Sequence, residues 1–280
     1  MIDTPLGWIL LFGFGLFTGT LAGILGIGGG LLNVPALTLA GATTLQATAT
    51  SLIGVLLSAT SGSIRNLQTG SLNWKVALLL GGFGVFSAQV GTWLGAQMPD
   101  ALLSIGFALL ALATIYLMGL KRSLVQEERK AQGAGETEEA REAVEAREAG
   151  EDGAQYRVLP TTGIGVVAGL LSGLFGVGGG AVMVPLQMLV LHEPIKTAVR
   201  TSLGAIVAIA SSALIRQSIG GHVLWIPGLC LGAGAIIGAQ FGTRLLPKLS
   251  DKTITTLFRL LLLGLSSYMM LRGLNALIGS

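Results

Sequence analysis

The sequence predicts an all-α, polytopic membrane protein made of a duplicated repeat of about five membrane segments, with a charged linker between the two copies. Three observations carry this prediction: 51% of the 280 residues are hydrophobic, only 11% are charged, and 43 are glycine. Soluble domains carry about 25% charged residues, whereas membrane helices pack closely through small residues. With one cysteine and two histidines, we expect neither a metal site nor a cofactor.

One long polar stretch interrupts the apolar sequence, at residues 121–158. It contains seven of the basic and ten of the acidic residues, and its Ala, Glu and Arg favour partial helix. The acidic residues outside it lie near the ends of apolar runs and are Asp3, Asp100, Glu193 and Asp251. We therefore predict a first membrane repeat at 1–120, a solvated linker at 121–158 and a second membrane repeat at 159–280.

Apolar runs recur in both halves of the chain. A helix needs about 20 residues to cross a hydrocarbon core of about 30 Å. The runs lie at about 6–25, 31–41, 45–64, 75–97 and 101–120, and then at about 160–175, 181–191, 196–215, 223–246 and 253–273. The first is expected to be retained, because Met1–Pro5 carries an acid and no base. The runs at 31–41 and 181–191 are too short to span alone, so either they return within the membrane or the glycines before them lie at depth.

The two halves match each other in order. Gly26–Gly30 reads Gly-Ile-Gly-Gly-Gly and recurs 150 residues later as Gly-Val-Gly-Gly-Gly at Gly176–Gly180, and each copy is followed by Val-Pro. After one inserted residue, Thr50-Ser51-Leu52 pairs with Thr201-Ser202-Leu203, Arg65 with Arg216, Trp74 with Trp225, and Gln89 with Gln240. Internal duplication of this kind is a common build for secondary transporters.

The basic residues favour an inverted repeat. With five crossings per half, one side of the membrane receives Arg65, Lys75, Lys121, Arg122, Arg157, Lys196, Arg200, Arg244, Lys248 and Lys252, and the other receives Arg216 and Arg272. Four crossings per half would divide these residues almost evenly. Because positive residues accumulate on the cytoplasmic side, we expect five crossings, a cytoplasmic linker and both termini outside.

The two glycine motifs are the candidate substrate site. Glycines let the backbone break a helix and approach a ligand closely, and the helix that follows offers free N–H groups and a dipole that favour an anion. Two such turns facing each other would form one anion site near the midplane. The glycines expected to bind are Gly28, Gly29, Gly30, Gly178, Gly179 and Gly180. The alternative is that they only allow close packing of helices.

Polar residues near these motifs are further candidates. Hydroxyls can donate to an oxyanion or bond back to a helix, and the matched ones are Thr50, Ser51, Thr201 and Ser202. Asn33 is polar where its counterpart is Met183, so its contact with substrate would make the site asymmetric. The matched amides Gln89 and Gln240 either bind ligand or bridge helices, because buried amides need partners. Arg65 and Arg216 either draw anions into a vestibule on each face or anchor lipid headgroups.

The doubled Gly-x-Gly-Gly-Gly…Val-Pro motif, the Thr-Ser-Leu that follows it and the duplicated layout resemble the TauE/SafE sulfite exporter family, also called the TSUP permeases. The resemblance covers residues 6–120 and 160–273 and not the linker. It implies a permease or exporter of small sulfur-containing anions, such as sulfite or organosulfonates, in the inner membrane. We expect it to work by alternating access, with one repeat rocking against the other. An anion channel of the same fold, or a carrier of another small organic anion, is the alternative.

The expected partners are a small anionic substrate and the lipid bilayer, with no nucleic acid. An enzyme is not expected, because the apolar segments contain no His, Asp or Glu at depth. The absence of a carboxylate there also argues against a carboxylate proton relay. Coupling to a proton carried by the anion, to the membrane potential or to nothing stays open, as do the direction of transport and the oligomeric state.

Overall fold

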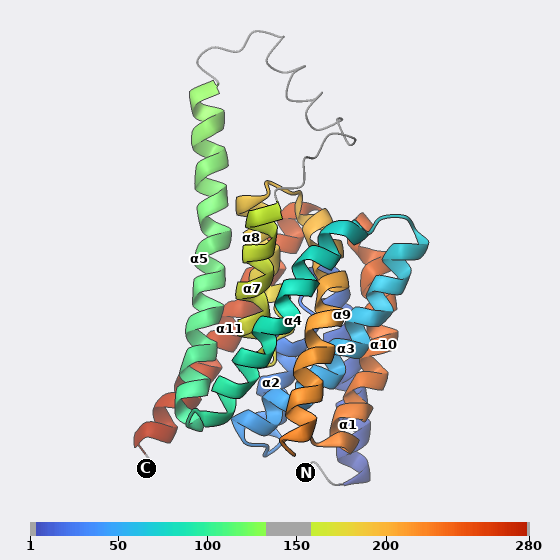
Figure 1. The fold of residues 1–280 in the computed structure, drawn as a ribbon, viewed down its shortest axis with the longest axis vertical. Coiled ribbons are helices and arrows are strands. Elements are labelled where there is room, and N and C mark those ends of the chain that lie inside the picture. The colour runs from blue at the N-terminus through green and yellow to red at the C-terminus, as the bar shows by residue number, and fades with distance from the viewer. Residues whose placement is uncertain (1–3, 133–157, 279–280) are drawn as a thin grey trace.

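The computed structural model describes residues 4–132 and 158–278, and the regular elements in these ranges are all helical (Figure 1). The first half contains α1 (Pro5–Leu25), α2 (Gly30–Leu39), α3 (Thr44–Gln68), α4 (Trp74–Gln97) and α5 (Asp100–Gln132). The second contains α7 (Val158–Phe175), α8 (Gly180–Val190), α9 (Ile195–Ile219), α10 (Trp225–Leu245), the 3₁₀ turn η1 (Leu246–Lys248) and α11 (Asp251–Ile278). Each apolar run of the sequence is therefore a helix.

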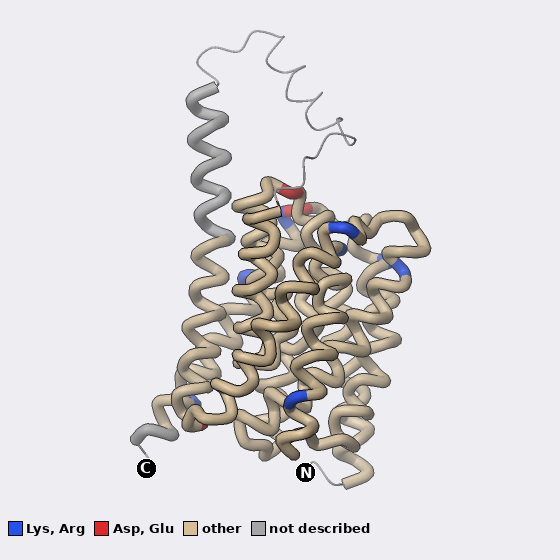
Figure 2. The backbone as a smooth tube through the Cα atoms, viewed as in Figure 1, with Lys and Arg blue, Asp and Glu red and all other residues tan. Residues whose placement is uncertain are grey.

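Eight of these helices are long and apolar enough to cross a bilayer, and α2 and α8 are the short exceptions. The outer surface is strongly apolar, with large exposed side chains such as Ile9, Phe86 and Leu260. The charged residues lie mostly near the two ends of the bundle (Figure 2). Together these features confirm an all-α, multi-pass membrane protein.

The expected linker is described only in part. Helix α5 continues to Gln132, twelve residues beyond the predicted end of the first repeat. Residues 133–157 lie outside the described residues. The boundaries at 120 and 158 and the cytoplasmic position of the linker stay predictions.

Local sequence signals set where several helices begin. Thr4 caps α1, with its hydroxyl accepting from the Gly7 N–H at 3.2 Å, and Pro5 follows in the first turn. Thr43 and Gln46 form a capping box at the start of α3, with both bonds at 3.2 Å. The Thr44 N–H also donates to Asp100 at 2.9 Å, which ties the start of α3 to the start of α5. A capping interaction of this kind is worth about 1 kcal/mol.

Helices α1 and α10 pack through backbone contacts that only glycine permits. A Cβ on Gly15 or Gly19 would overlap the backbone of α10, and one on Gly234 or Gly238 would overlap the backbone of α1. Gly15 contacts Leu231 and Gly19 contacts Ala235, so the residue numbers of the contacts increase along both helices. The two helices therefore run in the same direction. Helices α7 and α4 repeat this arrangement, with Gly165 and Gly169 against the backbone of α4.

These contacts interleave the two halves of the sequence. Helix α1 packs most closely on α10, and α7 packs most closely on α4. Helix α10 also packs on α3, and α9 also packs on α4. We call α1, α3 and α10 the first unit, and α4, α7 and α9 the second unit. Each unit therefore contains helices from both repeats, and α3 and α9 form the contact between the units.

The short helices complete two hairpins that enter the bundle from opposite ends. Helix α10 begins beside the first turns of α3, because the Leu224 N–H just before α10 donates to Thr50 Oγ1 at 2.9 Å. Helix α1, parallel to α10, thus begins at the end where α2 leads into α3. Helix α7, parallel to α4, begins at the other end, where α8 leads into α9 (Figure 1). At about 1.5 Å per residue, the 10 residues of α2 cover about 15 Å, half of the hydrocarbon core.

The glycine packing predicts a sharp contrast within α1. Replacing Gly19 by Ala places a methyl group on the Ala235 backbone and should destabilise the protein by about 1–3 kcal/mol. Replacing Gly13, which has nothing within 4 Å of its Cβ position, should leave stability unchanged or raise it, because Ala favours helix by about 1 kcal/mol. Thermal unfolding in detergent measures both. An equal loss of stability in the two variants would contradict the packing account.

Candidate functional site

The two glycine turns, Gly26–Gly30 and Gly176–Gly180, cross each other inside the bundle and are completely buried. A Cβ on Gly30 would overlap the carbonyl oxygen of Gly176, and a Cβ on Gly180 would overlap that of Gly26. The turns therefore run antiparallel in direct backbone contact. Gly29 and Gly179 precede α2 and α8 with φ of 77° and 79°, a left-handed conformation that glycine adopts without strain.

Two matched serines each form a hydrogen bond between one turn and a helix of the opposite unit. Ser51 on α3 donates to the Gly176 carbonyl at 2.8 Å, and Ser202 on α9 donates to the Gly26 carbonyl at 2.9 Å. Each hydroxyl also lies within 3 Å of a carbonyl in its own helix. The bonds satisfy carbonyls left open where α1 and α7 end. Both serines, expected to touch substrate, thus bind backbone in this conformation.

Two matched aliphatic side chains fill the centre of the crossing. Val55 Cγ1 lies 2.9 Å from a Cβ position built on Gly28, and Ile206 Cγ2 lies 3.3 Å from the same position. The same two side chains contact Gly178. Val55 and Ile206 have no exposed surface. The space between the turns is therefore filled in this structure, and the turns form a packed junction.

The matched amides bridge helices within the units. Gln240 on α10 donates to the carbonyl and the hydroxyl of Ser61 on α3, both at 2.9 Å. Gln89 on α4 donates to the same two atoms of Ser212 on α9, at 2.8 and 2.6 Å. Of the two interpretations that the sequence left open, helix bridging is the one observed in this conformation.

The remaining polar candidates differ in their partners. Thr50 Oγ1 accepts the Leu224 N–H. The Thr201 hydroxyl and both side-chain polar atoms of Asn33 are buried and make no hydrogen bond. Buried polar groups without partners are uncommon and costly. The side chains of Asn33 and Thr201 thus still have hydrogen-bonding capacity for a ligand.

The matched arginines lie far from the turns. Arg65 is in the last turn of α3 and Arg216 is in the last turn of α9, at opposite ends of the bundle (Figure 1). Arg65 is half-buried and Arg216 is exposed. This placement suits either a vestibule or a headgroup anchor, so the choice between them stays open.

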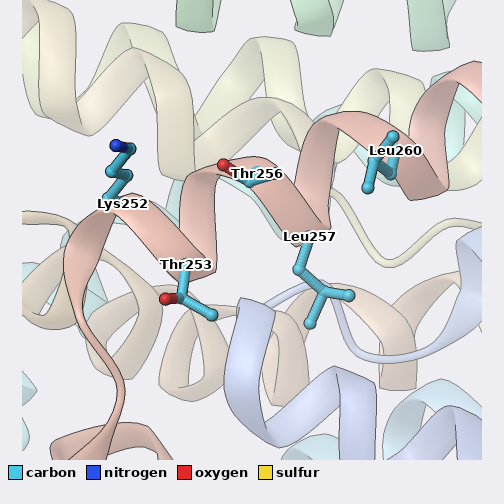
Figure 3. A pocket seen from close by; sticks show the side chains of 5 residues that line it. All are labelled: Lys252, Thr253, Thr256, Leu257 and Leu260. Carbon is cyan, nitrogen blue, oxygen red and sulfur yellow. The ribbon is translucent and has the colours of Figure 1, made fainter.

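An open pocket of about 360 Å³ lies at the start of α11. Its lining residues are Lys252, Thr253, Thr256, Leu257 and Leu260 (Figure 3). Four of them, Lys252, Thr253, Thr256 and Leu260, are exposed. None of the predicted site residues lines it.

The ends of the short helices show features that the sequence did not reveal. Arg272 on α11 donates to the Thr38 and Ala42 carbonyls at 3.2 and 3.4 Å, so a cation stabilises the carboxyl end of α2. Glu193, in the connection after α8, is partly buried, and this desolvation raises the pKa of its carboxyl. Among the described residues, no three His, Cys, Asp or Glu side chains are grouped to bind a metal.

Comparison with known proteins decides the family. The model of the sulfite exporter TauE/SafE family matches residues 11–269. The chain belongs to the TauE/SafE sulfite exporter family. The resemblance predicted from the doubled glycine motif is thereby confirmed.

Several curated relatives of this TauE/SafE protein are similar over almost their whole length. The probable membrane transporter protein YunE of Bacillus subtilis is 27% identical over 279 residues, which cover 96% of this chain and 99% of YunE. A probable membrane transporter protein of Xylella fastidiosa is 24% identical, covering 96% and 97%. A third, from Methanocaldococcus jannaschii, is 25% identical, covering 94% and 95%. No solved structure matches the chain.

Sequence reasoning missed the side chains that close the crossing. Val55 and Ile206 are apolar and look like ordinary core residues, but they occupy matched positions at the 151-residue offset. That match was a signal in the sequence. No sequence signal indicated the role of Arg272, because its partners are backbone carbonyls at least 230 residues away in sequence.

The serine bonds predict a measurable loss of stability. Replacing Ser202 by Ala leaves the buried Gly26 carbonyl without its donor and should cost about 1–3 kcal/mol. Ser211 is the matched control, because it lies on the same helix and bonds to its own Val207 carbonyl. Its replacement by Ala should cost less than about 0.5 kcal/mol. Thermal unfolding of both variants measures these losses of stability. An equal loss in the two variants would contradict a stabilising role for the bond from Ser202 to Gly26.

Proposed function

We propose that this TauE/SafE protein is a carrier that moves small sulfur-containing anions, such as sulfite or organosulfonates, across the inner membrane by alternating access. Family membership and the names of the relatives support membrane transport. The crossing of the two glycine turns is the observation that carries the proposal. It places the beginnings of two helices in the interior, where helix dipoles favour an anion.

The free backbone donors at these helix starts support an anionic substrate. Among the described residues, the N–H groups of Gly30 and Leu31 at the start of α2 donate no hydrogen bond. The same is true of Gly180 and Ala181 at the start of α8. No side chain caps either helix. Unpaired N–H groups at a helix start are suited to an oxyanion.

We interpret the closed crossing as a conformation of the carrier in which Val55 and Ile206 close the site between the turns. Substrate entry then requires Val55 and Ile206 to separate from one turn. The Ser51 and Ser202 bonds join the first unit to the second, so they must break or exchange when the units move. Because each unit combines helices of both repeats, we propose that the units rock against each other, in place of one sequence repeat against the other.

The direction of the two hairpins supports an inverted repeat. Helices α1 and α7 run from opposite ends of the bundle toward the crossing. The end where α7 begins also receives Lys196, which bonds to Pro247 and pairs with Asp251 at 3.8 Å. We propose that this end, with its excess of basic residues, is cytoplasmic, and that the linker lies there.

Counterflow distinguishes a carrier from a channel. Liposomes containing the purified protein and unlabelled sulfite should transiently accumulate labelled sulfite above its external concentration, and uptake should saturate. Sulfite should also raise the melting temperature relative to chloride, because a ligand that binds the folded state stabilises it. Protein-free liposomes are the control. Uptake that neither saturates nor responds to internal sulfite would indicate a channel, and no uptake of any sulfur anion would overturn the assignment.

A further inference from the structure

Several matched positions around the crossing differ in polarity between the two repeats. Three matched positions are polar beside the first turn and apolar beside the second: Thr18 against Ala168, Asn33 against Met183, and Ser58 against Ile209. Thr18 and Ser58 already have partners, since Thr18 bonds to Gly15 and Ser58 donates to the Gly28 carbonyl at 2.9 Å. Asn33 is therefore the unsatisfied member of this set.

Asn33 points back to the start of its own helix. Its Nδ2 lies 3.6 Å from the Cβ position of Gly29, the residue that precedes α2. Its Nδ2 also lies 2.7 Å from the Cβ position of Gly54, where the second repeat has Ala205. The absence of a side chain at Gly54 thus makes room for the amide near Gly29, the residue before α2.

Both ends of the amide lack a partner. Asn33 has no exposed surface, and neither Nδ2 nor Oδ1 makes a hydrogen bond. Exchanging the two atoms by rotation of the amide would change nothing, because both are unsatisfied. An amide offers N–H donors and one acceptor oxygen. A ligand that satisfies it must therefore accept one hydrogen bond and donate another.

We propose that Asn33 determines the form in which the anion is carried, a singly protonated oxyanion bound at the start of α2 in the first repeat. This proposal rests on the proposed transport function and deepens it. The oxyanion oxygens accept from Asn33 Nδ2 and from the Gly30 and Leu31 N–H groups, and the ligand hydroxyl donates to Asn33 Oδ1. The proton travels on the anion, so the membrane segments need no carboxylate for it.

Other titratable groups near α2 do not face Asn33. Described residues 5–25 of α1 contain none, and α3 contributes Arg65 in its last turn. On α11, Tyr268 and Arg272 contact Thr38 at the other end of α2. Asp251, Lys252 and Arg259 are farther along α11, toward its start. The pH dependence of binding should then follow the protonation of the ligand.

The test compares Asn33→Leu with Gln187→Leu. Gln187 is the matched control, because it is a fully buried amide without a partner on α8, two helical turns beyond the glycines. Removing an unpartnered buried amide removes a desolvation cost, so neither variant should have a lower melting temperature than the parent. Sulfite counterflow and competition by methanesulfonate are measured at pH values on either side of the pKa of hydrogen sulfite. Methanesulfonate carries one negative charge but has no proton to donate.

The parent protein should bind total sulfite more weakly as pH rises, in proportion to the loss of hydrogen sulfite, and should prefer hydrogen sulfite to methanesulfonate by about tenfold or more. Asn33→Leu should lose that preference and raise the half-saturating concentration by about tenfold, whereas Gln187→Leu should match the parent. Unchanged transport and preference in Asn33→Leu would overturn this proposal and leave the carrier function standing. If the parent carries no anion, the carrier function fails and this proposal fails with it.

Discussion

The whole structure depends on the close approach of two backbones at the crossing of Gly26–Gly30 and Gly176–Gly180. Any side chain at Gly30 or Gly180 would overlap a carbonyl oxygen of the opposite turn. Because the turns touch, α1 and α7 must end in the interior and α2 and α8 must begin there. That geometry accounts for the two short helices. It also places the free N–H groups of those helices beside the crossing, where the two repeats contact each other through backbone.

Irregular backbone at membrane depth is tolerated where protein buries it. In this bundle, matched residues of the two repeats bury it. Ser51 and Ser202 satisfy carbonyls of the turns, and Val55 and Ile206 fill the space between them. The tight helix pairs α1–α10 and α4–α7 then join each turn to helices of the other repeat. Because of this interleaving, each of the two units contains helices of both repeats, and the turns lie at the boundary between the units.

Much of the fold was predictable because hydrophobic length and duplication are strong signals in a membrane protein. The ten apolar runs, the short segments at 31–41 and 181–191 and the matched glycines all have direct counterparts in helices and turns. For the site, the sequence predicted which segments come together but not the partners of the individual side chains. Sequence could not show that Gln89 and Gln240 bridge helices or that Ser51 and Ser202 bind backbone, because those partners are 123–179 residues away in sequence. Asn33 was visible as a mismatch with Met183, but its lack of any partner required the packed structure.

The most direct test is to cross-link the two side chains that lie between the glycine turns and to measure transport. Val55→Cys and Ile206→Cys are introduced together in a Cys230→Ser background, since Cys230 is the one native cysteine. A short thiol-specific cross-linker should join the two positions in the membrane, stop sulfite counterflow, and release it again on cleavage of the link. If the two positions cannot be joined, or if transport continues unchanged with the link complete, then the turns do not meet and separate as described.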